Sequence, residues 1–103
     1  MFYNAYHRVE NVSNPKGDPK LYNVVGYICE TDTFADDRIL TEVRKNDLIL
    51  FHNAGAYCFM MASNYNLRSK PAEVLLYNGK SYLIGKREEF EDLTRNFVEV
   101  KLD

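Results

Sequence analysis

The feature that most constrains the fold is an Asn-Gly dipeptide, Asn78-Gly79, inside the segment AEVLLYNGKSYLIGK (Ala72–Lys86). Both central positions of a two-residue type I′ turn require a positive φ, which asparagine and glycine adopt more readily than other residues. Apolar and aromatic residues stand on either side of the dipeptide. The segment is therefore predicted to form a β-hairpin.

Short strand-like segments separated by turn residues make up most of the remaining chain. NPKGDPK (Asn14–Lys20) is predicted to be a loop, because proline and glycine do not suit a central strand. REEFEDLTRN (Arg87–Asn96) has the acidic start and basic end that favour a short helix. The further predicted strands are Leu21–Cys29, Asp47–Asn53, Ala56–Ala62 and Phe97–Leu102. This pattern predicts a mainly β fold, a Greek-key-like β-barrel or sandwich with one short helix near the C-terminus.

Composition narrows the class of protein. A chain of 103 residues is expected to be one domain, residues 1–103. Its net charge of −2, with both signs mixed, argues against nucleic acid or a membrane as partner. No membrane span or signal peptide is recognisable, so Cys29 and Cys58 are expected to be reduced thiols in the cytoplasm. His7 and His52 are isolated and no C-x-x-C spacing occurs, so no metal site is expected.

Three polar stretches stand out as candidate functional segments. ICETDTFADD (Ile28–Asp37) places a thiol beside a carboxylate at the end of a predicted strand, before a loop rich in aspartate. NAGAY (Asn53–Tyr57) has a glycine that would let the backbone approach another group closely. SNYNLRSKPAEV (Ser63–Val74) is a long polar loop, and loops often carry function. Each stretch also has a purely structural interpretation, as an incidental pair at a strand end, an ordinary hairpin turn and a solvated connection.

GYICETDTF, NAGAYCFMMASNYNLRSKPAEVLL and KREEFEDLTRN follow one another in an order and spacing typical of one family. On these motifs the chain resembles the C-terminal domain of diaminopimelate decarboxylases, which are fold type III pyridoxal phosphate enzymes. The resemblance implies a two-domain homodimer in which an α/β barrel holds the cofactor on a lysine and a C-terminal β-domain closes over it. The implied reaction converts meso-2,6-diaminopimelate to L-lysine and carbon dioxide.

The resemblance also implies roles for the thiol and the carboxylate. Cys29 and Glu30 match the family's Cys-Glu pair, which reaches the active site of the neighbouring subunit. Glu30 would hold the distal amino end of the substrate, and Cys29 would be the catalytic group that controls protonation of the reacting carbon. A thiol suits proton donation near neutrality, because its unperturbed pKa is about 8.5. A neighbouring carboxylate would favour the thiol over the thiolate.

Tyrosines supply the other implied contacts. Tyr57 matches the family tyrosine that lies against the cofactor and the substrate, and Tyr3 matches the one that grips a substrate carboxylate. A tyrosine offers an apolar face together with a hydroxyl, which suits both roles. The loop residues that match a family motif beside the site are Tyr65, Asn66 and Arg68.

Four departures from the family pattern limit what this chain can do alone. The family's Arg-Pro pair would fall before Met1, Thr31 replaces a serine, and Lys70-Pro71 replaces an Arg-Pro pair. No lysine here matches the lysine that binds the cofactor, so the chain alone is expected to lack decarboxylase activity. The surface that would pack on the barrel is expected to be exposed in this chain, and at least one sheet edge is expected to be unprotected. Both features predict self-association. Two alternatives remain open: a related decarboxylase acting on arginine, ornithine or carboxynorspermidine, and a stand-alone β-domain that binds or regulates a partner.

Overall fold

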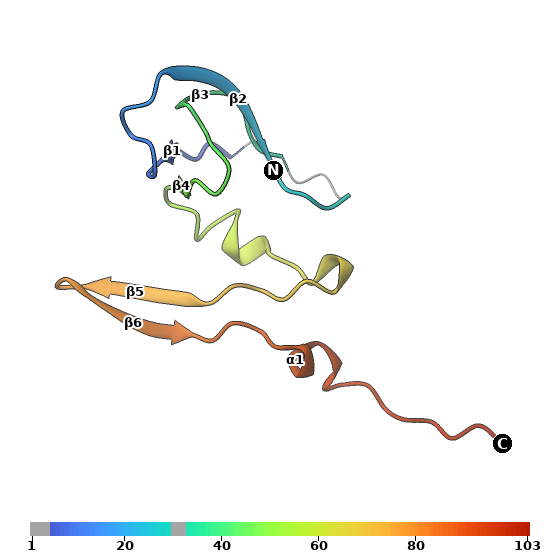
Figure 1. The fold of residues 1–103 in the computed structure, drawn as a ribbon. Coiled ribbons are helices and arrows are strands. Elements are labelled where there is room, and N and C mark those ends of the chain that lie inside the picture. The colour runs from blue at the N-terminus through green and yellow to red at the C-terminus, as the bar shows by residue number, and fades with distance from the viewer. Residues whose placement is uncertain (1–4, 30–32) are drawn as a thin grey trace. The chain divides into compact units, whose positions relative to one another are not determined.

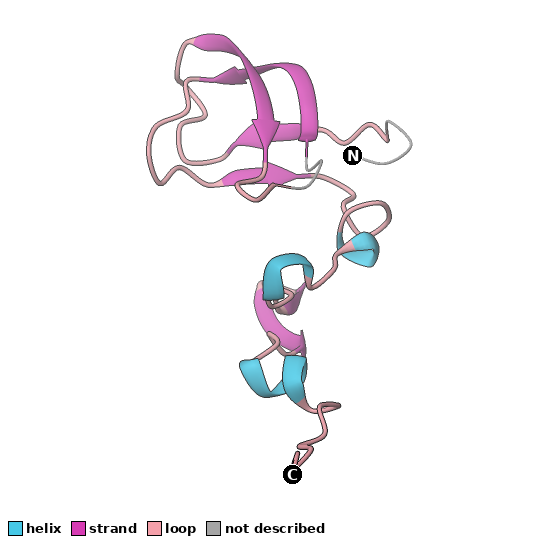
Figure 2. Ribbon diagram, turned by 90° about the vertical axis from the view of Figure 1, so that its right-hand side faces the viewer, coloured by secondary structure: helices cyan, strands magenta, loops and turns pink. Residues whose placement is uncertain are grey.

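A computed structural model describes residues 5–29 and 33–103 of the chain (Figure 1). The chain divides into two compact units, Met1–Met61 and Ala62–Asp103. Among the described residues, most regular elements are short strands, and one short α-helix lies near the C-terminus; the helix colour in Figure 2 also marks short 3₁₀ turns. The predicted mainly β class is therefore confirmed. A closed barrel or Greek key is not confirmed, because the described strands form three separate two-stranded sheets.

The first unit is built from two antiparallel strand pairs. Strand β1 (Val9–Asn11) pairs with β4 (Ile49–Phe51), so that Val9 lies opposite Phe51 and Asn11 opposite Ile49. Strand β2 (Pro19–Val25) pairs with β3 (Thr33–Thr41), so that Pro19 lies opposite Thr41 and Val25 opposite Thr33. Strand β1 also packs against β3, which joins the two pairs.

The core of the first unit is small. Its buried apolar residues are Val9, Ala35 and Leu40, and the half-buried residues packed against them are Tyr22, Val24, Val43, Ile49 and Phe51. Ala35 and Leu40 lie five positions apart, so in a regular strand they would face opposite sides of the sheet. The left-handed backbone of Asp37 (φ 50°) and a register shift between Tyr22 and Val24 change the phase of the strand. This β-bulge brings both side chains into one core.

Two of the strand predictions are wrong and two strands were missed. Ala56–Ala62 was expected to be a strand but contains the 3₁₀ turn η2 (Phe59–Met61). Phe97–Leu102 was expected to be a strand but has no regular structure and exposed side chains. The expected aspartate-rich loop after Cys29 is largely strand β3, and β1 had no sequence prediction. The expected loop Asn14–Lys20 ends early, because β2 begins at Pro19, a position that proline tolerates.

The second unit contains the predicted hairpin and the predicted helix. Strands β5 (Glu73–Tyr77) and β6 (Lys80–Gly85) pair antiparallel around Asn78 (φ 48°) and Gly79 (φ 71°), as a type I′ turn requires. The 3₁₀ turn η3 (Tyr65–Leu67) precedes the hairpin. Helix α1 (Phe90–Thr94) is shorter than predicted and begins with a capping box between Glu89 and Asp92. No side chain of this unit is buried.

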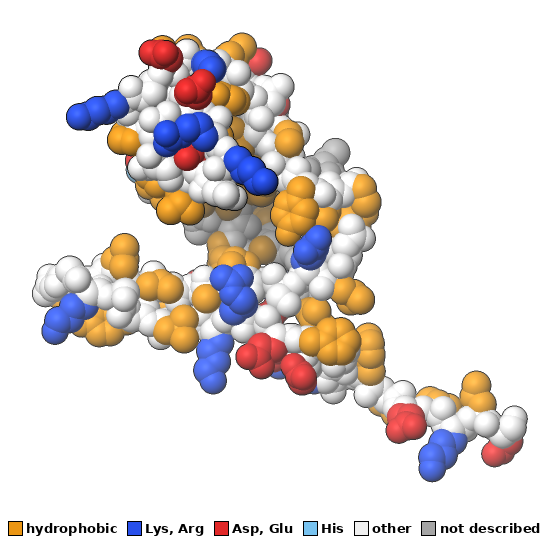
Figure 3. Space-filling model, viewed as in Figure 1, with side chains coloured by type: hydrophobic (Ala, Val, Ile, Leu, Met, Phe, Trp, Pro, Cys, Tyr) orange, Lys and Arg blue, Asp and Glu red, His pale blue; other side chains and the backbone are white. Residues whose placement is uncertain are grey.

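Surface charge is mixed, as the sequence predicted. On the face drawn in Figure 3, basic and acidic side chains are interspersed with hydrophobic ones. Within the part of the chain that the structure describes, no helix is long and apolar enough to cross a bilayer.

Candidate functional site

An aromatic contact defines one end of the first unit. The ring centroids of Phe34, at the start of β3, and Phe51, at the end of β4, lie 5.2 Å apart. The register places Val9, the first residue of β1, beside Phe51, and Val25, the last residue of β2, beside Thr33. All four strands therefore begin or end here, and we call this the aromatic end.

Three chain segments leave the strands at the aromatic end. They are the segment that precedes Val9, the connection 26–32 between β2 and β3, and the segment that follows Phe51. These are the segments that contain Tyr3, the Cys29-Glu30 pair and Tyr57, respectively. Strand direction and pairing thus bring the starting points of all three predicted site segments to one end of one unit.

The opposite end is held by an asparagine. The side chain of Asn11 is buried, and its Nδ2 donates to the Glu42 carbonyl (3.0 Å) and to Asp47 Oδ2 (2.8 Å). Its Oδ1 accepts hydrogen bonds from the backbone N–H groups of Ser13 and Asn14. The Asn11 hydrogen bond, followed by one from the Arg44 backbone, lowers the pKa of Asp47 below its usual value. This hydrogen-bond network therefore lies at the end of the unit opposite to the aromatic end, where the candidate site segments leave the strands.

Cys29 lies in the connection between β2 and β3, four residues beyond Val25, and its side chain is exposed. It is not in a disulfide. Glu30 and Tyr3, the other two predicted residues of this group, lie outside the described residues. The other thiol, Cys58, is half-buried, and burial raises its pKa.

Tyr57 has an unusual backbone. Its φ is 60°, in the left-handed region that a bulky side chain seldom adopts, and its side chain is 50% exposed. Hydrogen bonds from the N–H of Phe59 to the Ala54 carbonyl (2.9 Å) and from the N–H of Met60 to the Gly55 carbonyl (3.0 Å) enclose it in a tight turn. Strained positions of this kind concentrate at functional sites.

Gly55 has open space beside its backbone. A Cβ atom at this position would meet nothing within 4 Å among the described residues. The sequence led us to expect that this glycine permits a close approach of another group, and the described residues of the first unit place no group there. The open space beside Gly55 adjoins a turn that also carries the half-exposed ring of Tyr57.

Two histidines support the aromatic end, which the sequence analysis did not anticipate. His7 is 6% exposed, and its Nδ1 lies 3.1 Å from the carbonyl oxygen of His52. The backbone N–H of His52 donates to the Arg8 carbonyl (2.8 Å), and its Nε2 lies 3.2 Å from Glu10 Oε1. The available signal in the sequence was the alternation of the charged residues Arg8 and Glu10 with His7, Val9 and Asn11. This period of two is typical of a strand with one buried face.

The loop that contains Tyr65, Asn66 and Arg68 belongs to the second unit. Asn66 has a left-handed backbone (φ 54°), and the Arg68 N–H donates to the Tyr65 carbonyl. Glu88 is the anchor that the sequence analysis missed: its Oε2 accepts from the Lys70 backbone N–H (2.8 Å) and from Asn64 Nδ2 (2.6 Å). These hydrogen bonds, with that from Lys70 the larger effect, lower the pKa of Glu88.

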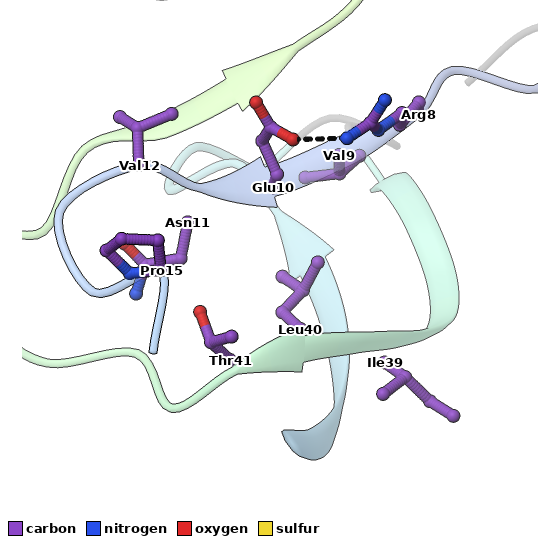
Figure 4. A pocket seen from close by; sticks show the side chains of 9 residues that line it. All are labelled: Arg8, Val9, Glu10, Asn11, Val12, Pro15, Ile39, Leu40 and Thr41. Carbon is purple, nitrogen blue, oxygen red and sulfur yellow. Dashed lines mark hydrogen bonds and ion pairs between the residues drawn. The ribbon is translucent and has the colours of Figure 1, made fainter. Parts of the chain in front are cut away.

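A separate cavity of about 430 Å³ lies between β1 and β3 (Figure 4). Its lining residues are Arg8, Val9, Glu10, Asn11, Val12, Pro15, Ile39, Leu40 and Thr41. Arg8 and Glu10 form an ion pair of 2.7 Å at one side of it. Of the predicted site residues that the structure describes, neither Cys29 nor Tyr57 lines this cavity. Within the described residues, no group of three His, Cys, Asp or Glu side chains is placed to hold a metal ion.

Comparison with known proteins identifies the family. The family model described as "Pyridoxal-dependent decarboxylase, C-terminal sheet domain" matches residues 1–55, just over half of the chain. A diaminopimelate decarboxylase from Methanothermobacter thermautotrophicus is 43% identical over 90% of this chain. A diaminopimelate decarboxylase from Aquifex aeolicus is 42% identical over 98% of this chain. The chain spans 22% and 23% of these two relatives, which is less than a quarter of their length.

Solved structures agree with the sequence relatives. A crystal structure of diaminopimelate decarboxylase from "m. jannaschi" superposes with a TM-score of 0.86 at 33% identity, covering 96% of this chain and 23% of that one. A Helicobacter pylori diaminopimelate decarboxylase complexed with L-lysine gives a TM-score of 0.78 at 39% identity, covering 90% of this chain and 23% of that one. From the family match, the sequence relatives and the shared fold, we conclude that the chain belongs to the pyridoxal-dependent decarboxylases, in their C-terminal sheet domain.

Proposed function

We propose that this chain is the C-terminal β-domain of a diaminopimelate decarboxylase that converts meso-2,6-diaminopimelate to L-lysine and carbon dioxide. The observation that carries the proposal is that the segments containing Tyr3, Cys29-Glu30 and Tyr57 all leave the strands at the aromatic end, in a chain about 42% identical to enzymes of that name. The alternative substrates arginine, ornithine and carboxynorspermidine are not favoured, because the relatives compared above carry the diaminopimelate name.

The domain contributes side chains to a site that is completed elsewhere. Pyridoxal phosphate, held on a lysine outside this chain, supplies the electron sink that makes loss of the carboxylate feasible. Cys29 is the proposed proton donor to the carbon that loses carbon dioxide, and its exposed side chain suits contact with a bound molecule. Tyr57, whose ring is half-exposed, would pack against the cofactor and substrate, and the open space beside Gly55 would leave room for them.

The other two residues bind the substrate. Glu30 is proposed to pair with the distal ammonium group, and Tyr3 to donate a hydrogen bond to a substrate carboxylate. Cys29 and Glu30 are proposed to reach the active site of the neighbouring subunit of a homodimer, so each site would need two chains. The two reduced thiols suit the expected cytoplasmic location of the enzyme.

A chimera tests the proposed function. Residues 1–103 replace the matching segment of the Aquifex aeolicus relative, to which 98% of this chain aligns. We expect the chimera to release lysine from meso-diaminopimelate but not to act on arginine or ornithine. The present chain mixed with pyridoxal phosphate is expected to release no lysine. A folded chimera that binds the cofactor and makes no lysine, beside an active parent enzyme, would refute the proposal.

Variants of the chimera test the residue roles. Cys29→Ala removes the proposed proton donor and is expected to lower kcat about a hundredfold or more. Cys58→Ala is the matched control, because it removes the other thiol and is expected to leave kcat unchanged. Equal effects of the two substitutions would contradict the role proposed for Cys29.

Mixed dimers test whether the site is shared. One chimera carries Cys29→Ala, and the other lacks the cofactor-binding lysine of the Aquifex part. If each site combines the two subunits, random mixing creates dimers with one intact site and restores roughly a quarter of full activity. If each subunit builds its own site, every mixture of the two variants stays at the background of the separate proteins.

A further inference from the structure

His7 joins two chain segments that the pairing of β1 with β4 does not join by itself. The last paired residues at the aromatic end are Val9 and Phe51. Beyond them, the N–H of His52 still bonds to the Arg8 carbonyl, at 2.8 Å. The carbonyl of His52 is then bonded by a side chain, Nδ1 of His7, at 3.1 Å. Both backbone groups of His52 are thus tied to the segment that leads into β1.

The hydrogen bond to the His52 carbonyl shows which ring nitrogen of His7 carries a proton. A backbone carbonyl only accepts hydrogen bonds, so Nδ1 of His7 must carry the proton. The other ring nitrogen is Nε2. This Nε2 is buried and has no hydrogen-bond partner among the described residues. Among the described residues, the hydrogen bond of the His7 side chain is therefore the one made by Nδ1.

The position of this bond relates it to the candidate site. His52 is followed by Asn53, whose left-handed backbone (φ 53°) turns the chain out of β4. Tyr57 lies four residues after Asn53, inside the turn closed by the Phe59 and Met60 N–H groups. A change in the direction in which the chain leaves His52 would therefore displace Tyr57. Small displacements of residues that contact the substrate can lower catalytic rates strongly.

We propose that His7 is a positioning residue for Tyr57: its Nδ1–H bond to the His52 carbonyl sets the direction in which the Asn53–Tyr57 segment leaves β4. The role of His7 in catalysis rests on the proposed function, because it acts through the contact of Tyr57 with cofactor and substrate. The structural part of the inference concerns only the first unit and stands independently.

Three substitutions separate the two nitrogens. In His7→Asn the amide nitrogen takes the place of Nδ1, and in His7→Gln it takes the place of Nε2. His7→Phe keeps a ring and has neither nitrogen. If Nδ1 carries the positioning, His7→Asn rescues what His7→Gln and His7→Phe lose.

The first readout is amide hydrogen exchange in the 103-residue chain. Exchange at Phe59 and Met60 reports the turn around Tyr57, and exchange at His52 reports the β1–β4 pairing. We expect His7→Gln and His7→Phe to speed exchange at Phe59 and Met60 about tenfold, the value of one lost hydrogen bond, and His7→Asn to remain close to wild type. Protection retained in His7→Gln and lost in His7→Asn would overturn the proposal, as would equal exchange in all four proteins. Loss of the whole fold in His7→Asn as well as in His7→Phe would indicate a packing role and overturn it too.

The second readout uses the chimera with the Aquifex enzyme. His7→Gln and His7→Phe are expected to lower kcat about tenfold or more with a smaller change in KM, and His7→Asn to restore it. An inactive wild-type chimera would refute the proposed function, while the exchange experiment would still decide the positioning role. An active chimera in which all three variants equal wild type would refute the positioning role alone.

Discussion

The rings of Phe34 and Phe51 lie 5.2 Å apart and are tilted by 53° relative to each other. The two residues belong to β3 and β4, which are not paired with each other in the described sheets. Their contact therefore links the β2–β3 pair to the β1–β4 pair at the end where the three candidate site segments emerge. Tilted aromatic pairs at this separation contribute more than the apolar area they bury.

A double-mutant cycle on this pair should reveal coupling. Phe34→Ala, Phe51→Ala and the double variant are expected to give an interaction free energy of about 0.5–1.5 kcal/mol in urea unfolding. Leu21→Ala, at an exposed position of β2 in the same unit, is the control and should not couple to Phe51. Strict additivity of the Phe34 and Phe51 substitutions would show that the ring contact does not stabilise the unit.

The lowered pKa of Asp47 predicts how the free energy of unfolding of the first unit depends on pH. Hydrogen bonds from the Asn11 side chain and then from the Arg44 backbone lower its pKa in the folded state. A carboxylate whose pKa is lowered on folding stabilises the fold at neutral pH, and this contribution is lost as the pH drops below the ordinary carboxyl value towards the folded one. The free energy of unfolding should therefore begin to decrease as the pH falls below about 4.

The variant Asp47→Asn isolates this contribution. It should be less stable than wild type at pH 7, because a charge-assisted hydrogen bond is weakened, and its stability should fall less steeply below pH 4. Glu42 also has a lowered pKa in both proteins, chiefly through its hydrogen bond and ion pair with Lys20, and the Asp47 charge is the smallest of the effects on that pKa. Only the difference between the two pH profiles of urea unfolding reports Asp47, and parallel profiles would contradict the prediction.

The two thiols should differ in reactivity. Cys29 is exposed, whereas Cys58 is half-buried and has a pKa raised by burial. Because the thiolate is the reactive form, a disulfide reagent such as dithionitrobenzoate should modify Cys29 first. Cys29→Ser should therefore remove the fast phase and Cys58→Ser the slow phase. The assignment would be wrong if Cys58→Ser abolished the fast phase.

Local signals in the sequence were enough for the hairpin but not for the first unit. The Asn78-Gly79 turn is determined by two neighbouring residues, so it could be predicted without knowledge of the fold. Strand β3 was missed because the bulge at Asp37 interrupts the alternation that marks a strand. The apolar run Ala56–Ala62 was mistaken for a strand because periodicity alone does not separate a short strand from a helical turn.

The residues of the candidate site also differ in whether local sequence was enough to predict them. Cys29 and Tyr57 were found through motifs, and the structure adds that their segments start from one end of one unit. His7 was judged to be isolated because its partner, the His52 carbonyl, is 45 positions away along the chain. Only strand pairing brings the two together, and no local pattern in the sequence encodes a backbone carbonyl as a partner.

The substitution Gly55→Ala distinguishes an effect on function from an effect on stability. Its backbone does not have a positive φ among the described residues, and a Cβ atom would meet nothing within 4 Å. Gly55→Ala should therefore not lower the free energy of urea unfolding of the chain. In the chimera it should lower activity, because the added methyl group would occupy space proposed for the cofactor or substrate.

Gly79→Ala is the matched comparison. Gly79 also has open space beside it, but its φ of 71° strains any other residue. We expect this substitution to destabilise the β5–β6 hairpin by about 1 kcal/mol, which faster amide exchange in both strands would show. Gly79 is not a proposed contact of the cofactor or substrate, so the activity of the chimera should not decrease. If Gly55→Ala destabilised the fold as much as Gly79→Ala, a loss of activity would report folding. If Gly55→Ala left both stability and activity unchanged, the space beside Gly55 would lie outside the site.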